Sequence, residues 1–182
     1  LMFYMIMALS LCDIAAWIMP SFHAKLPVAF ALTLALMIYG YINYRNPHIE
    51  HIEISVDKPI EGNSLKIAAV SDVHLGYGTD KKALERYVEL INSENSDVVL
   101  IAGDLIDNSV KPVVSQQMNE ELNKIAAPQG VYMVMGNHEF ISGAEAVERF
   151  IGTTNIHLLR DSVATLPSGL QIVGREDRTN RQ

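Results

Sequence analysis

The feature that most constrains the fold of this chain is the lack of charge in its first quarter. Residues 1–45 of the 182 contain three formally charged side chains, namely Asp13, Lys25 and Arg45. The whole chain carries a formal net charge of −7, so the acidic residues are concentrated after position 45. The sequence therefore predicts an apolar membrane-spanning region (1–45), a connector (46–64) and an acidic globular domain (65–182).

Composition excludes several classes of protein. Hydrophobic residues make up 49% of the chain, which is too many for a disordered or collagen-like protein. The single cysteine, Cys12, cannot form an internal disulfide. The acidic balance makes long nucleic acids poor partners, so we expect no nucleic-acid ligand.

Residues 26–44 form an uncharged stretch of 19 residues. As a helix it would be about 28 Å long, close to the roughly 30 Å thickness of the hydrocarbon core of a membrane. Three tyrosines, Tyr39, Tyr41 and Tyr44, gather at its end and are followed by Arg45, as in an interfacial belt. This stretch predicts a transmembrane helix.

A second apolar stretch, residues 1–19, predicts another transmembrane helix, with a turn at 20–25. Asp13 is unfavourable in lipid, so it would face the neighbouring helix, be protonated or lie near an interface. A single span is the alternative; a cleaved signal peptide fits poorly because no basic segment precedes the stretch. We expect an integral cell-membrane protein, but the few basic residues do not indicate on which side the domain lies.

The polar part of the chain alternates between apolar runs and helical periodicity. Strands are predicted at 49–56, 65–70, 97–102, 130–135, 156–159, 162–166 and 169–173, and helices at 81–95, 113–126 and 143–150. This order is typical of α/β proteins with a layered sheet. The nearly continuous apolar strands predict a sheet covered on both faces.

Three of the predicted strands are followed by residues that can bind metal ions. Asp72 and His74 follow the first, Asp104 and Asp107 the second, and Asn137 and His138 the third. Taken alone, each cluster has an ordinary interpretation: Asp72 as a helix cap, Gly-Asp-x-x-Asp as a turn. Because ligands bind at the carboxyl ends of strands in open α/β sheets, we expect the three clusters to converge.

The residue types share one chemistry. Carboxylate, imidazole and amide oxygen together suit Mn, Fe, Zn or a similar divalent ion. An aspartate can bridge two ions, and two ions roughly 3.5–4 Å apart can clamp a phosphoryl group and activate water. The three clusters therefore predict a site for divalent metal ions, of a kind that could act on a phosphoryl group if two ions bind.

The segments Ser-Asp-Val-His-Leu-Gly (71–76), Gly-Asp-Leu-Ile-Asp (103–107) and Gly-Asn-His-Glu (136–139) resemble the first three motifs of the calcineurin-like metallophosphoesterases. The resemblance covers roughly residues 65–173 and is nearest to the bacterial membrane-anchored branch. It implies part of an α/β sandwich and the hydrolysis of phosphomonoesters or phosphodiesters.

The resemblance also implies a role for each residue. Asp72 and His74 would bind the first metal, Asp104 would bridge both metals, and Asn137 would bind the second. His138 would contact the phosphate and protonate the leaving oxygen, while Asp107 would orient His138.

The chain departs from the family pattern after these motifs. The family also requires a later histidine and a Gly-His-x-His motif, whereas the last histidine here is His157, which we interpret as structural or surface. With the initial Leu1, this suggests a sequence cut at both ends, with a partial and weakly active site. A degenerate phosphoesterase-like binding or regulatory membrane protein is the alternative.

The membrane region suggests a partner class. An anchored site would lie beside the bilayer, so a lipid-linked phosphate ester is one expected substrate and a soluble nucleotide is another. The sequence indicates neither a choice between them nor an oligomeric state.

Overall fold

The computed structural model describes residues 2–19, 21, 24–57 and 64–178. The predicted turn at 20–25 and connector at 46–64 therefore lie partly outside the described residues. The chain divides into two compact units, residues 1–54 and 55–182. Each unit is described by itself.

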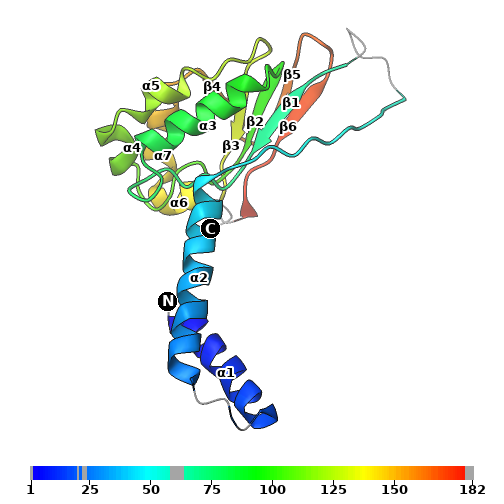
Figure 1. The fold of residues 1–182 in the computed structure, drawn as a ribbon. Helices are drawn as coiled ribbons and strands as arrows, with labels where there is room; N and C mark the ends of the chain where they lie inside the picture. Colours follow the sequence, from blue (N-terminus) through cyan, green and yellow to red (C-terminus); the bar gives the residue numbers. More distant parts are fainter. Residues whose placement is uncertain (1, 20, 22–23, 58–63, 179–182) are drawn as a thin grey trace. The chain divides into compact units, whose positions relative to one another are not determined.

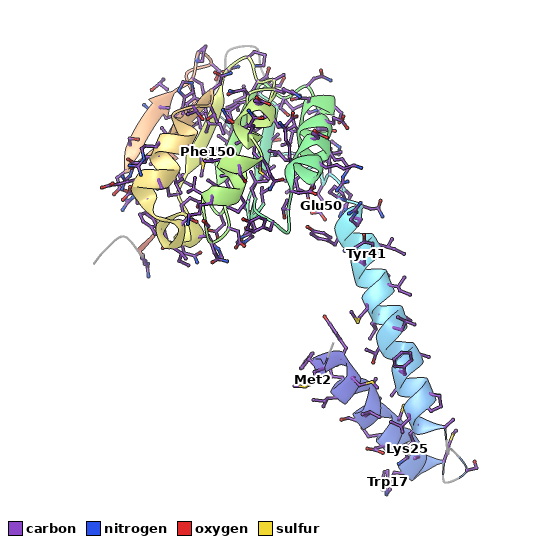
Figure 2. The ribbon with its side chains drawn as sticks, turned by 90° about the vertical axis from the view of Figure 1, so that its left-hand side faces the viewer. Met2, Trp17, Lys25, Tyr41, Glu50 and Phe150 are labelled. Atoms are coloured by element: carbon purple, nitrogen blue, oxygen red, sulfur yellow. The ribbon has the colours of Figure 1, made fainter. Side chains whose placement is uncertain are left out.

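The first unit is a pair of helices, α1 (Met2–Ile18) and α2 (Lys25–Arg45). They touch through small side chains, since Ala8, Cys12 and Ala29 are buried. Large apolar side chains point outward, as Figure 2 shows for Trp17, which is 85% exposed. Such packing of small residues is typical of helices in lipid.

Within the described residues, α2 is the helix that is long and apolar enough to cross a membrane. Helix α1 is shorter, with 17 residues. Asp13 in α1 is paired with Lys25, whose Nζ lies 2.7 Å from Asp13 Oδ1. The carboxylate predicted to be unfavourable in lipid thus faces the neighbouring helix and has a cationic partner.

The second unit is built on a parallel sheet in the order β1-β2-β3-β4. Its strands are β1 (Ile67–Val70), β2 (Val98–Ala102), β3 (Val131–Val134) and β4 (Ile156–Leu158). Between them run α3 (Lys81–Ser93), α4 (Lys111–Ser115), α5 (Met118–Leu122), α6 (Asn137–Ser142) and α7 (Ala144–Ile151). The predicted α/β fold is confirmed.

The core lies between the sheet and helices α3, α4, α5 and α7, which gather on one side of it (Figure 1). Alternate strand residues, such as Val99, Ile101 and Met133, point into this core. The opposite face is only partly covered within the described residues, because Ile67, Ala69 and Ala102 are exposed. The prediction of two covered faces therefore holds for the first face and, within the described residues, only in part for the second, where Val98 is buried.

Two strands, β5 (Ser162–Thr165) and β6 (Gln171–Gly174), form a separate antiparallel hairpin. The guanidinium of Arg160 contacts the carboxylates of Glu176 and Glu148, and these contacts raise its pKa above the usual arginine value. This three-residue ion cluster ties the chain after the hairpin to α7.

Three details of the sequence prediction differ from the structure. Residues 49–56 form no strand, and Ile52 and Ile54 are exposed, because alternation makes a strand only where a ladder partner exists. The predicted helix at 113–126 is two short helices, broken where Gln117 adopts a left-handed backbone (φ 53°). Helix α6 was not predicted, although it carries Asn137 and His138.

Candidate metal centre

The backbone brings the first two predicted clusters side by side beyond the ends of β1 and β2. The amide N–H of His74 donates to the Asp104 carbonyl over 3.0 Å, and the Leu75 N–H donates to the Leu105 carbonyl over 2.8 Å. The Asp107 N–H returns a bond of 3.1 Å to the Leu75 carbonyl. These bonds extend the parallel ladder, so the loops after β1 and β2 are fixed relative to each other.

Three of the predicted site residues have a left-handed backbone: φ is 54° at Asp72, 50° at His74 and 52° at Asp104. Residues with a Cβ adopt this conformation at a cost of roughly 1–2 kcal/mol. Aspartate and histidine tolerate it better than most residues. Such strain is typical of functional sites, where it aims side chains in directions that a regular strand does not allow.

The side chains of His74, Asp104 and His138 converge. Each offers one ligand atom, and these atoms lie within 4.8 Å of one another. The two imidazole rings meet edge to face, with centroids 4.4 Å apart and an interplanar angle of 81°. The three residues come from three different strand ends, as the sequence predicted for the clusters.

Asp107 lies beside both imidazoles. Its Oδ1 is 3.3 Å from His138 Nδ1 and 3.7 Å from His74 Nδ1. Within the described part of the chain, His138 Nδ1 is buried and forms no hydrogen bond, because the short approach to Asp107 is poorly aligned. Asn108 Nδ2 donates to the same carboxylate oxygen over 2.9 Å. The Asp107 carboxylate therefore lies close to both imidazoles.

Asp72 and Asn137 lie at the exposed edge of the site. The Asp72 side chain is 68% exposed, and its Oδ1 is 3.9 Å from His74 Nε2. Asn137 is exposed at the first residue of α6. His157 is exposed on β4 and stacks against Tyr132, with ring centroids 5.2 Å apart, so it does not belong to the cluster.

The loops after β2 and β3 approach so closely that only glycine fits. A Cβ on Gly136 would lie 2.8 Å from the Cγ and the backbone nitrogen of Asp104. A Cβ on Gly103, where φ is +90°, would lie 2.9 Å from the Gly136 Cα. The two glycines therefore allow the Asp104 carboxylate to pack against the loop after β3. There, Asp104 Oδ1 accepts the backbone N–H of His138 over 2.9 Å.

Glu139 was not among the residues predicted from the sequence to have a role at the site. This side chain is fully buried, and its carboxylate accepts the backbone N–H groups of Asp104 (2.9 Å), Ile106 (2.8 Å) and Gly136 (2.8 Å). The available signal was the glutamate at the third residue of a helix, where a side chain can cap the N-terminus. Its contacts with a loop 35 residues away could not be read from that pattern.

The donor set suits a divalent cation. Two imidazoles and a carboxylate are ligands for Zn, Mn or Fe. The Nδ1 atom of His138 is buried and forms no hydrogen bond within the described residues. A catalytic role or a nearby ion is a usual explanation for a buried polar atom of this kind. The residues present fit a metal ion, and they account for part of a coordination shell.

The fold and the cluster define a class: an α/β protein with a candidate metal site at the carboxyl ends of parallel strands. The family model described as calcineurin-like phosphoesterase matches residues 65–176, and the chain belongs to this family.

Several relatives share this domain. The chain is 36% identical over 115 residues to a "transmembrane protein with metallophosphoesterase domain" of Danio rerio, covering 62% of this chain and 26% of that protein. It is 33% identical over 137 residues to an "uncharacterized metallophosphoesterase" of Helicobacter pylori, covering 75% of this chain and 36% of that protein. The chain thus spans about a quarter to a third of the length of these two relatives.

Proposed function

We propose that this chain belongs to a membrane-anchored, divalent-metal-dependent phosphoesterase that hydrolyses phosphomonoester or phosphodiester bonds. The observation that carries the proposal is the convergence of His74, Asp104 and His138, whose ligand atoms lie within 4.8 Å of one another. Membership of the calcineurin-like phosphoesterase family supports the reaction class.

Four residues would hold two metal ions. Asp72 and His74 would bind the first, Asp104 would bind both, and Asn137 would bind the second through its amide oxygen. The Asp104 carboxylate, whose Oδ1 accepts the His138 backbone N–H, would be held in place for this role by that bond. The ions would supply charge neutralisation for the phosphoryl group and a source of hydroxide at neutral pH.

His138 would act as the general acid. Its imidazole lies beside the His74 ring, so it is within reach of a phosphate held at the cluster. Asp107, 3.3 Å from His138 Nδ1, would aim the ring, leaving Nε2 to donate to the leaving oxygen. Because the ligand atoms of His74, Asp104 and His138 lie within 4.8 Å of one another, His138 is also close enough to bind a metal ion. The roles of general acid and metal ligand therefore need separate tests.

The membrane part of the proposal is supported by α2, which is long and apolar enough to span a bilayer, and by the Danio rerio relative named as a transmembrane protein. The short α1, paired with α2 through Asp13 and Lys25, would form a second membrane segment. Since an anchor keeps the site near the bilayer, we propose a lipid-linked phosphate ester as the substrate class.

A metal titration tests the proposal. The 182-residue chain in detergent micelles would be titrated with Mn²⁺ by calorimetry, and hydrolysis of a p-nitrophenyl phosphodiester would be followed in parallel. We expect saturable binding that Asp104→Asn weakens about 100-fold or more, since loss of an outer-shell partner alone typically weakens binding 10–100-fold.

Asp161→Asn is the matched control, because Asp161 is an aspartate with a left-handed backbone (φ 42°) outside the cluster. Equal Mn²⁺ binding by the two variants, or no binding by the parent chain, would refute the metal site and favour a degenerate binding module. Comparison with a phosphodiester-linked lipid in mixed micelles tests the substrate: equal rates on both substrates would argue against the lipid preference.

A further inference from the structure

The carboxylate of Glu139 connects two loops beside the candidate metal site, the loop after β2 and the loop after β3. Its Oε2 accepts the Asp104 N–H and the Gly136 N–H, and its Oε1 accepts the Ile106 N–H. Asp104 and Ile106 follow β2, whereas Gly136 follows β3. One side chain therefore satisfies three backbone donors on two loops that are distant in the sequence.

Glu139 is too deeply buried to serve as a metal ligand. It has no exposed surface, and both carboxylate oxygens are occupied by N–H donors. A buried carboxylate is costly unless hydrogen bonds compensate it, and three charge-assisted bonds do so here. The same bonds satisfy backbone donors that would otherwise be unpaired at the turn between β2 and the cluster.

The loop geometry links these bonds to Asp104. The backbone on both sides of the Asp104 side chain is held by Glu139, through the amides of Asp104 and Ile106. The Asp104 carboxylate then packs against Gly136, which Glu139 also holds. Because Asp104 has the strained φ of 52°, an external restraint of this kind is needed to keep it in place.

We propose that Glu139 is a positioning residue: by clamping the loops after β2 and β3 together, its carboxylate sets the affinity of the cluster for a divalent cation. This inference rests on the proposed function, since it requires that the cluster binds a metal. In this proposal, Glu139 acts through the positions of Asp104 and His138 and does not contact the ion.

Glutamine is the informative substitution because it keeps the shape of the side chain. Its one oxygen can still accept the Asp104 and Gly136 N–H groups, but its NH₂ group would then face the Ile106 N–H, and two donors cannot pair. If the glutamine amide is turned the other way, its NH₂ group faces the Asp104 and Gly136 N–H groups. Two hydrogen bonds are then lost, compared with one in the first orientation. Glu139→Gln therefore loosens the clamp without leaving a cavity.

Glu121→Gln is the matched control. Glu121 is a buried glutamate of the same unit, 5% exposed on α5, and its carboxylate accepts from Lys124 Nζ. Both substitutions replace a buried carboxylate with an amide, but only Glu139 contacts the cluster loops. A general effect on folding would appear in both variants.

The test is an Mn²⁺ titration of the parent chain and both variants in detergent, at a temperature where circular dichroism shows all three folded. We expect the dissociation constant to rise about 10–100-fold in Glu139→Gln, the range found for outer-shell partners of metal sites, and to stay within about threefold in Glu121→Gln. Equal affinity of parent and Glu139→Gln would overturn the inference. Absence of binding by the parent would instead overturn the proposed function.

A measurement on the parent chain covers the case in which Glu139→Gln does not fold. Amide hydrogen exchange without metal should show the N–H groups of Asp104, Ile106 and Gly136 protected, because all three are bonded to the buried carboxylate. Exchange of these amides as fast as that of exposed loop residues would show that the clamp does not exist, and would overturn the inference.

Discussion

The helix pair and the α/β unit bury opposite kinds of side chain. In the helix pair the buried residues are small, such as Ala8 and Ala29, and the large apolar side chains face outward. In the α/β unit the buried residues are large, such as Met133 and Ile101. Polar side chains gather where the strands of this unit end. Small buried residues beneath large apolar outer side chains are typical of helices packed in lipid, whereas large buried apolar residues are typical of domains that face water.

The first and largest predicted effect concerns His138 at the strand ends of the α/β unit. His138→Gln removes the proposed general acid, and we expect hydrolysis of a p-nitrophenyl phosphodiester at saturating Mn²⁺ to fall by roughly 10²–10⁴-fold. The Mn²⁺ dissociation constant should change little, because His138 is not assigned as a ligand. A large loss of Mn²⁺ affinity would show that His138 ligates and that the acid is another group.

The second prediction concerns the core of the α/β unit. Met133→Ala should lower its free energy of unfolding by about 2–5 kcal/mol, because Met133 is 1% exposed and its truncation leaves a cavity. Leu36→Ala on α2, where the side chain is 51% exposed, should leave that unfolding transition unchanged. Denaturant titration in detergent measures both, and equal effects would break the contrast between the two units.

The third prediction concerns the helix pair. Ala29→Leu should destabilise the packing of α1 against α2 by about 1–3 kcal/mol, because Ala29 is fully buried in that contact. Cys12, the single cysteine of the chain, is buried in the same contact and reports on it. Maleimide labelling of Cys12 should be faster in Ala29→Leu than in Phe30→Leu, an exposed neighbour; equal rates would argue against the contact.

The smallest expected effect comes from backbone strain at the site. Asp72→Gly and Asp72→Ala both remove the carboxylate, but only glycine adopts φ near 54° without strain. We expect the glycine variant to be more stable by about 1 kcal/mol, measured by thermal melting. Greater stability of the alanine variant would show that Asp72 is not held in the left-handed region in solution.

The sequence predicted the sheet and the converging strand ends because both depend on local patterns. Short apolar runs followed by polar clusters mark β1, β2 and β3, and parallel strands place such clusters at one edge. The proximity of His74, Asp104 and His138 followed from that rule without any contact being known.

Other features depended on contacts between distant segments and could not be predicted. The carboxylate of Glu139 acts on a loop that is remote in sequence. The break at Gln117 accompanies two hydrogen bonds of the Gln116 side chain, which accepts the Lys81 backbone N–H and donates to the Gly76 carbonyl. The partial exposure of the second sheet face could not be predicted for the same reason. An apolar strand residue such as Ala69 is compatible with a buried or an exposed position until its neighbours are known.

The most direct test of the metal site is the response of individual histidines to one equivalent of Zn²⁺, followed by NMR of the imidazole resonances. We predict that His74 and its neighbour His138 shift strongly, because ligation fixes a tautomer and alters the adjacent ring. His157, exposed on β4 and stacked on Tyr132, should not shift. Unchanged resonances of His74 and His138, or equal shifts of all three, would contradict a metal centre at the strand ends.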